Sequence, residues 1–131
     1  MVVKTGVSLP DSLYARLQEL AASMGYSSIS RAIRDAVEIF IAFNSWWNHR
    51  GRLRGVIVVA AAGRERLPSQ LLRVIERDAV NELYVEKPSS PEKPYLVYIF
   101  VEAEASELKE LYKELTRTRG VVMVQPVFVP D

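Results

Sequence analysis

The chain has 131 residues, of which 49% are hydrophobic and 25% are charged, and its formal net charge is +1. This composition is typical of a folded globular protein and excludes a disordered one. The absence of cysteine and the single histidine, His49, exclude disulfides, thiolate metal sites and clusters of imidazole ligands. Because the net charge gives no general attraction to phosphate, binding to a nucleic acid would rest on a local basic surface.

The chain has no apolar stretch near the roughly 20 residues that a membrane span needs, and no charged and then apolar signal pattern at its start. We therefore expect a cytoplasmic protein without membrane contact. The length suits one ordinary domain or two very small ones, and two small domains would need association to complete their cores.

Residues 3–9 alternate between two kinds of side chain, with the period of a strand. The packing side holds Val3, Thr5, Val7 and Leu9, and the polar side holds Lys4, Gly6 and Ser8. A lone strand leaves its backbone groups unpaired, so we expect pairing with the same strand of a second chain in an antiparallel ribbon. Such a ribbon fits the major groove of DNA, where Lys4 and Ser8 can reach base edges and Gly6 offers no side chain.

Two helices are predicted after the strand. Apolar stripes indicate helices over 10–24 and 29–46, with Gly25 ending the first and Ser27 and Ser28 offering N-cap oxygens to the second. The far end of the second helix has more apolar residues than one stripe needs, namely Phe40, Ile41, Phe43, Trp46 and Trp47. Another chain or domain is expected to cover them.

The order of strand, Leu-Pro-Asp, helix and Gly-Tyr-Ser-Ser-x-Ser-x-Ala-Ile-Arg-Asp over 3–46 resembles the signature of ribbon-helix-helix (CopG-type) repressors. The resemblance implies a homodimer that binds double-stranded DNA and grips a backbone phosphate at the start of the second helix. Ser28, Ser30 and the free amides of a helix N-terminus are a physical basis for that grip.

Arg31 stands where a capping box would place Glu or Gln, so it puts a cation against the positive end of the helix dipole. Two interpretations remain open. Arg31 either contacts a DNA phosphate, or extends into solvent and pairs with Asp35 one turn later.

Residues 48–52 are polar and contain a glycine, which predicts a linker between a ribbon-helix-helix domain over 1–47 and a second domain over 53–131. Trp46 and Trp47 lie beside this linker and are expected to bury the junction between the domains.

The second domain follows the order βαββαβ. Its pattern predicts strands over 53–61, 80–87, 94–103 and 120–129, and helices over 67–79 and 105–119. This order indicates an α+β protein whose second domain is one antiparallel sheet with both helices on one face, which is the ferredoxin-like (ACT-type) arrangement.

With this second domain, nearly the whole chain resembles the nickel-responsive repressors (NikR-like). The resemblance implies a tetramer formed by the C-terminal domains, and in those repressors three histidines and a cysteine bind nickel. The corresponding positions here are Tyr84-Val85-Glu86 for His-x-His, Pro94 or Tyr95 for the cysteine, and Arg73 or Glu76 for the third histidine. Since nickel requires imidazole and thiolate donors, we predict no nickel response.

The sequence gives weaker indications of any other ligand of the second domain. The carboxylates of Glu76, Glu82, Glu86 and Glu92 suit a hard cation, but scattered carboxylates are usually solvated, so we predict no metal and no cofactor. An ACT-type fold implies a small-molecule effector, which stays unidentified. Two readings of Tyr84, Tyr95 and Tyr98 are open: they line a pocket, or they pack within the sheet and its interface.

These patterns predict a sequence-specific DNA-binding transcriptional regulator, a repressor that assembles as a homodimer and a homotetramer. The alternative is an antitoxin-type ribbon-helix-helix protein that binds a partner protein through its C-terminal part. An enzyme is not expected, because the run of Glu102, Glu104, Glu107 and Glu110 is better explained as a solvated face than as positioned acid and base groups.

Overall fold

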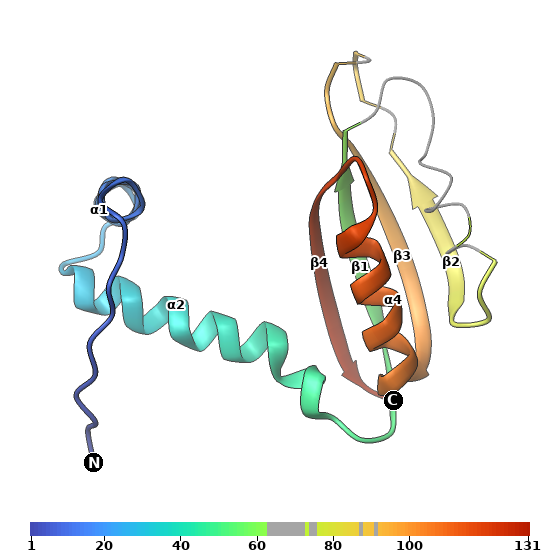
Figure 1. Cartoon of the computed structure of the whole chain (residues 1–131), viewed down its shortest axis with the longest axis horizontal. Helices are drawn as coiled ribbons and strands as arrows, with labels where there is room; N and C mark the ends of the chain where they lie inside the picture. Colours follow the sequence, from blue (N-terminus) through green and yellow to red (C-terminus); the bar gives the residue numbers. More distant parts are fainter. Residues whose placement is uncertain (63–72, 74–75, 87, 91) are drawn as a thin grey trace. The chain divides into compact units, whose positions relative to one another are not determined.

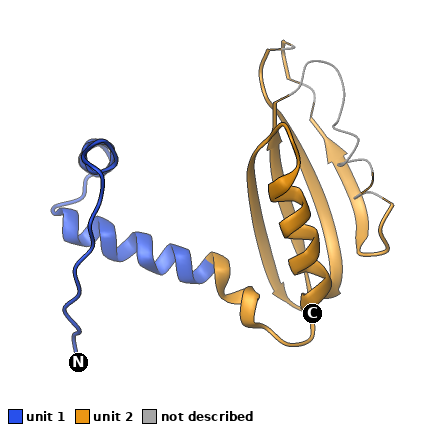
Figure 2. Ribbon diagram, in the orientation of Figure 1, with its two compact units in different colours: residues 1–42 blue, residues 43–131 orange. Residues whose placement is uncertain are grey.

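The structure is a computed structural model that describes residues 1–62, 73, 76–86, 88–90 and 92–131. The chain divides into two units, Met1–Ala42 and Phe43–Asp131 (Figure 2), so the division falls earlier than the linker expected at 48–52. No helix in these described ranges is long and apolar enough to cross a membrane.

The N-terminal unit consists of a segment without regular structure and two helices (Figure 1). Helix α1 spans Asp11–Ser23 and α2 spans Ile29–Asn44, close to the predicted limits. Between them Gly25 has a φ of +85°, the left-handed conformation in which glycine commonly ends a helix. The two predicted helices and the stop between them are therefore confirmed.

The strand predicted over residues 3–9 is not formed in the single chain, where residues 1–10 have neither helix nor strand. A strand exists only through the ladder of hydrogen bonds to a neighbouring strand, and the described part of this unit offers no other strand. The expected ribbon requires a second copy for the same reason.

The predicted helix over 29–46 ends two residues early, and the chain then tightens into a 3-10 turn, η1, over Ser45–Asn48. Trp46 in this turn is buried, with 6% of its surface exposed. Its ring packs edge to face against two rings of the same C-terminal unit, Tyr112 of Ala105–Arg117 and Phe128 of Val121–Pro130.

The C-terminal unit is built on a four-stranded antiparallel sheet in the order β2-β3-β1-β4 (Figure 1). Its elements are β1 Arg52–Ala61, β2 Val80–Val85, β3 Tyr95–Glu104, α4 Ala105–Arg117 and β4 Val121–Pro130. The predicted strands and the last helix are confirmed within a few residues. The helix predicted over 67–79 falls mostly outside the described residues.

Helix α4 covers one face of the sheet, because its apolar residues recur at helical spacing on one side. Leu108, Leu111 and Leu115 of this helix are buried against the sheet. The strands contribute alternate residues to the same core, including Leu53, Ile57, Val59, Val97, Ile99 and Val101. Burial therefore alternates along β3, as in a sheet with one face packed on the core.

The other face of the sheet is also largely apolar. Its apolar residues include the alternate positions Val56 and Val58 of β1, Leu96, Tyr98 and Phe100 of β3, and Val127 and Val129 of β4, and the same face carries Arg54, Glu102 and Gln125. Phe100, Val127 and Val129 are 41%, 43% and 44% exposed. We call this set the open sheet face.

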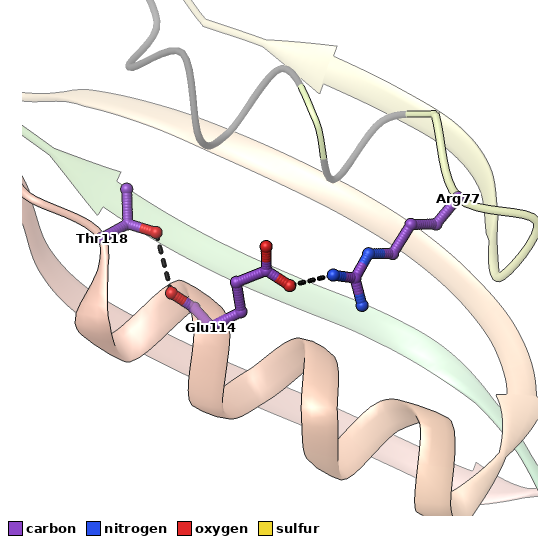
Figure 3. Close-up of polar contacts among 3 residues, drawn as sticks. All are labelled: Arg77, Glu114 and Thr118. Atoms are coloured by element: carbon purple, nitrogen blue, oxygen red, sulfur yellow. Dashed lines mark hydrogen bonds and ion pairs between the residues drawn. The ribbon is translucent and has the colours of Figure 1, made fainter.

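Arg77, from the segment before β2, forms an ion pair with Glu114 of α4 (Figure 3). The main-chain carbonyl of Glu114 accepts a 2.8 Å hydrogen bond from Oγ1 of Thr118, which is 6% exposed. These contacts hold the end of α4 and tie it to the approach to β2.

Candidate nucleic-acid interface

The three residues of the predicted ribbon face, Lys4, Gly6 and Ser8, are all exposed. Residues predicted for the packing side are exposed as well, since Val3 and Val7 are 76% and 69% exposed. A β-branched apolar side chain is rarely left in water to this extent in a completed core. In the single chain both sides of this segment are therefore open to a partner.

The start of α2 is capped by Ser28. Its Oγ accepts a 3.2 Å hydrogen bond from the Arg31 amide, and its carbonyl accepts a 3.3 Å bond from the Ala32 amide. An N-cap serine satisfies the orphan donors of the first turn in this way. Of Ser27 and Ser28, the two residues predicted to offer an N-cap oxygen, Ser28 is therefore the N-cap of α2.

Two backbone donors remain at this helix end. Within the described residues, the amides of Ile29 and Ser30 donate to no protein acceptor. Such amides, together with the helix dipole, favour an anion. The hydroxyl of Ser30 and the side chain of Arg31 are exposed beside them. Ser28, Ser30 and Arg31 thus share one end of α2.

Arg31 does not pair with Asp35, the partner that one interpretation gave it. Asp35 instead accepts a 2.6 Å hydrogen bond from the Tyr26 hydroxyl, and no ion pair of Arg31 occurs in the part of the chain that the structure describes. The carboxylate is directed to the tyrosine that precedes the helix, so the guanidinium stays available at the helix start.

The contact between Tyr26 and Asp35 raises the pKa of Tyr26 above its ordinary value of 10.0. The hydrogen bond to Asp35 is the main cause, desolvation and the charge of Asp35 act in the same direction, and Arg31 lowers the pKa. Sequence reasoning missed this pair, because a spacing of nine residues across a turn carries no periodic signal.

The two groups of predicted site residues lie apart in the chain. Lys4, Gly6 and Ser8 are on the segment before α1, and Ser28, Ser30 and Arg31 are at the start of α2. No hydrogen bond or ion pair joins the two groups anywhere in the described ranges.

In the C-terminal unit, the three tyrosines that might have lined one pocket lie on opposite faces of the sheet. Tyr84 pairs with Tyr98 across β2 and β3, with ring centroids 5.8 Å apart. Tyr95 differs from Tyr98 by an odd number of positions and belongs to the buried core on the helix side, where burial raises its pKa. The reading as one common pocket is therefore wrong.

Glu86 and Tyr95, two of the positions that the resemblance relates to nickel ligands, also lie apart. Glu86 lies two residues beyond Tyr84 and is exposed, whereas Tyr95 is buried on the other face. Among the described residues, no group of three or more His, Cys, Asp or Glu side chains is placed to hold a metal ion.

Comparisons with known proteins agree with this architecture. The model of the family described as "Ribbon-helix-helix protein, copG family" matches residues 3–42. "Putative nickel-responsive regulator 1" of Methanosarcina mazei is 32% identical over 122 residues, which cover 92% of this chain and 84% of the relative.

Two further relatives match over a similar extent. "Putative nickel-responsive regulator 3" of Methanosarcina acetivorans is 28% identical over 92% of this chain and 87% of its own. A protein of Thermococcus kodakarensis with the same kind of name is 26% identical over 92% of this chain and 88% of its own. The chain therefore belongs to the ribbon-helix-helix family of regulators that includes these proteins, and it is a DNA-binding transcriptional regulator.

Proposed function

We propose that two copies of the chain pair residues 3–9 into an antiparallel ribbon that reads the major groove of a specific DNA site. The exposure of Val3 and Val7 in the single chain is the observation that carries this proposal. When residues 3–9 of two chains pair, the backbone N–H and C=O groups of both segments gain hydrogen-bond partners. The apolar side of the ribbon then faces the helices of the dimer.

The helices support the same dimer. Apolar residues of α1 and α2 are exposed in the single chain, among them Leu13, Leu20, Val37, Phe40 and Ile41 at 46% to 68%. The unit buries few apolar side chains of its own, with Ala21 and Ala32 as the buried residues of the two helices. A partner copy would supply the missing core.

On the DNA, Lys4 and Ser8 would face the bases from both strands of the ribbon, and Gly6 would let the backbone approach closely. The free amides of Ile29 and Ser30, the hydroxyl of Ser28 and the side chain of Arg31 would bind a phosphate beside the groove. The unpaired state of Arg31 favours this role over a structural one.

The C-terminal units would join two such dimers into a tetramer. The open sheet face supports this step, because a sheet with one uncovered apolar face gains from packing against a second copy. Two ribbons held in one assembly bind two half-sites with higher affinity than either ribbon alone. Occupation of promoter DNA in this way would make the protein a repressor.

The proposed regulator does not respond to nickel. Nickel prefers imidazole and thiolate donors, whereas the positions that the resemblance relates to the ligands hold Tyr84 and Glu86, Pro94 or Tyr95, and Arg73 or Glu76.

The experiment that tests the function is fluorescence anisotropy with duplexes enriched from a random library, at several salt concentrations, with and without nickel. Lys4→Ala is expected to weaken binding and reduce selectivity among sequences. Arg31→Ala is expected to weaken binding to all sequences alike and to lower the salt slope by about 0.9 per lost phosphate contact. Lys93→Ala, in the C-terminal unit, removes the same charge and serves as control.

Absence of binding, or affinity unchanged by both substitutions, would refute the DNA-reading surface. A nickel-dependent rise in affinity of more than about tenfold, which corresponds to 1.4 kcal/mol, would refute the claim that the protein does not respond to nickel.

A further inference from the structure

Strand β4 lies at one edge of the sheet and has an apolar sequence. The strand order β2-β3-β1-β4 leaves the side of β4 that is turned away from β1 without a neighbouring strand (Figure 1). We call this side the β4 edge. None of the ten residues of the strand is charged, and Val122, Met123 and Val127 are 63%, 56% and 43% exposed. An exposed edge of this kind is a template on which a strand of another chain can pair.

The hydrogen bonds between β1 and β4 show which residues turn their backbone groups to this edge. In an antiparallel pair, opposite residues alternate between those that exchange hydrogen bonds and those whose N–H and C=O groups point away from the partner strand. The Asp131 amide donates a 3.1 Å hydrogen bond to the carbonyl of Arg52, which stands opposite it in the register. Counting from this bonded pair gives the positions directed to the β4 edge, namely Val124, Pro126, Phe128 and Pro130.

Two of these outward positions are prolines. Proline has no N–H group, so Pro126 and Pro130 offer no donor to a further strand. The carbonyl of Pro126 is engaged as well, because it accepts a 3.1 Å hydrogen bond from Nε2 of Gln125. At Pro126 the β4 edge therefore lacks a donor, and its acceptor already has a partner.

A bulge interrupts the same edge four residues before Pro126. The register between β1 and β4 shifts between Ala60 and Ala61, so that Val122 is an extra residue of β4. A bulge twists its strand locally and breaks the regular spacing of backbone groups. Interruptions thus recur at Val122, Pro126 and Pro130, and a regular ladder along the β4 edge has no room to form.

The opposite edge of the sheet is limited in a different way. Strand β2 has six residues, its register with β3 shifts between Val80 and Glu82, and the carboxylate of Glu82 is exposed. Short length, a bulge and a charge are common means of keeping an edge strand from pairing. The open sheet face differs from both edges, because Phe100, Val56 and Val127 adjoin one another across three strands.

We propose that Pro126 and Pro130 close the β4 edge to a second copy of the chain and so direct the association of C-terminal units to the open sheet face. The proposal rests on the C-terminal association proposed above and is independent of how DNA is bound. Packing of one sheet face on another ends when both faces are covered, whereas an edge that also paired would let the assembly grow beyond a tetramer.

Proline is tolerated at an outward edge position even where it protects nothing, so the experiment restores the missing donors. Pro126→Thr combined with Pro130→Thr gives the β4 edge an N–H group at both positions, in a residue type that strands favour. Pro88→Thr combined with Pro94→Thr removes as many prolines outside the strands and is the matched control.

Light scattering of the full chain without DNA measures the association. The wild type and the control should both have the mass of a tetramer, whereas the double variant of β4 should exceed this mass by about twofold or more and grow with concentration. Phe100→Arg, on the open sheet face, should lower the mass of the wild type. Val122→Arg adds the same charge at the bulge and should leave the mass unchanged.

Amide hydrogen exchange tests the β4 edge in the wild type without any substitution. The amides of Val127 and Val129 face β1 in the ladder and should exchange slowly. Those of Val124 and Phe128 point to the β4 edge, where the described residues supply no acceptor, and should exchange about tenfold faster or more in the assembled protein. In the double variant these two outward amides should become protected.

Three results would each overturn this inference: slow exchange at Val124 and Phe128 in the wild type, a double variant with the mass of the wild type, or a mass that Phe100→Arg leaves unchanged. A wild type that forms no tetramer would refute the association and the inference with it. The readouts need no DNA, so absence of DNA binding would refute the DNA-reading function and leave this inference standing. If circular dichroism shows that a variant does not fold, exchange in the wild type decides.

Discussion

The hydroxyl of Tyr26 donates a 2.6 Å hydrogen bond to Oδ2 of Asp35, and this bond ties the residue that precedes α2 to the second turn of the same helix. Asp35 thus has Tyr26 as its hydrogen-bond partner, and among the described residues it forms no ion pair with the exposed Arg31. One side-chain contact thus shapes the surface proposed to bind phosphate.

The first prediction concerns the titration of Tyr26. Because its pKa is raised above 10.0 in the folded protein, the stability that the hydrogen bond contributes is fully present below pH 10. This stability is lost as the pH rises through the raised pKa that Tyr26 has in the folded protein. Asp35→Asn removes the charge that opposes ionisation, so Tyr26 should ionise at lower pH than in the wild type, as measured by tyrosinate absorbance.

Tyr26→Phe identifies the signal of Tyr26 among the six tyrosines by subtraction. Its melting temperature should fall below that of the wild type at neutral pH, and the difference should shrink at strongly alkaline pH. An identical titration in the wild type and in Asp35→Asn would contradict the assigned contact.

The second prediction separates the two roles of Ser28. Ser28→Ala removes the N-cap of α2 and should lower the free energy of unfolding by about 1 kcal/mol. It should weaken DNA binding as well.

Ser28→Asp keeps a capping oxygen and adds a negative charge that the helix dipole favours, so the free energy of unfolding should be retained. The same carboxylate should repel the DNA phosphate and weaken binding more strongly than Ser28→Ala does. Chemical denaturation and anisotropy measure the two effects, and unchanged DNA affinity of Ser28→Asp would exclude a phosphate at this helix end.

The third prediction compares two glycines. A Cβ at Gly55 would overlap the carbonyl oxygen of Val127 and lie 2.9 Å from Cα of Phe128, so β4 would have to move. Gly55→Ala should therefore destabilise the C-terminal unit by about 1–3 kcal/mol. A Cβ at Gly6 meets no atom within 4 Å, so Gly6→Ala should leave the melting temperature unchanged.

Gly6→Ala also reports on the ribbon. The added methyl group would project from the polar side toward the groove, where it can contact a thymine methyl, so sequence preference should change while the fold does not. Equal melting temperatures for Gly55→Ala and Gly6→Ala would show that β1 and β4 are not as close as described.

The fourth prediction contrasts two contacts of α4. Thr118→Val removes the 2.8 Å hydrogen bond that the buried hydroxyl donates to the Glu114 carbonyl, and should cost about 1 kcal/mol at any salt concentration. Arg77→Ala removes an ion pair whose side chains are 41% and 36% exposed, and should cost less than about 0.5 kcal/mol. Denaturation at low and high salt distinguishes them, because salt should abolish the effect at Arg77 alone.

Local patterns predicted most of the helices and strands that the structure describes. The patterns over 53–61, 94–103 and 105–119 predicted two strands and a helix that the structure contains at nearly the same residues. Side-chain periodicity reports which face of an element is buried, and this information is present in any short stretch of chain. The cap at Ser28 and the stop at Gly25 were predictable for the same local reason.

The sequence by itself thus determined helices α1, α2 and α4, the four strands of the C-terminal unit, the family, and the absence of histidine and cysteine from residues 53–131. Only the tertiary structure decided that Trp46 belongs to the C-terminal unit, that Asp35 pairs with Tyr26, that Tyr95 lies opposite Tyr98, and that Gly55 must remain small. The physical reason is that each of these outcomes depends on contacts between residues far apart in the chain or on strand register, and no local period specifies those partners.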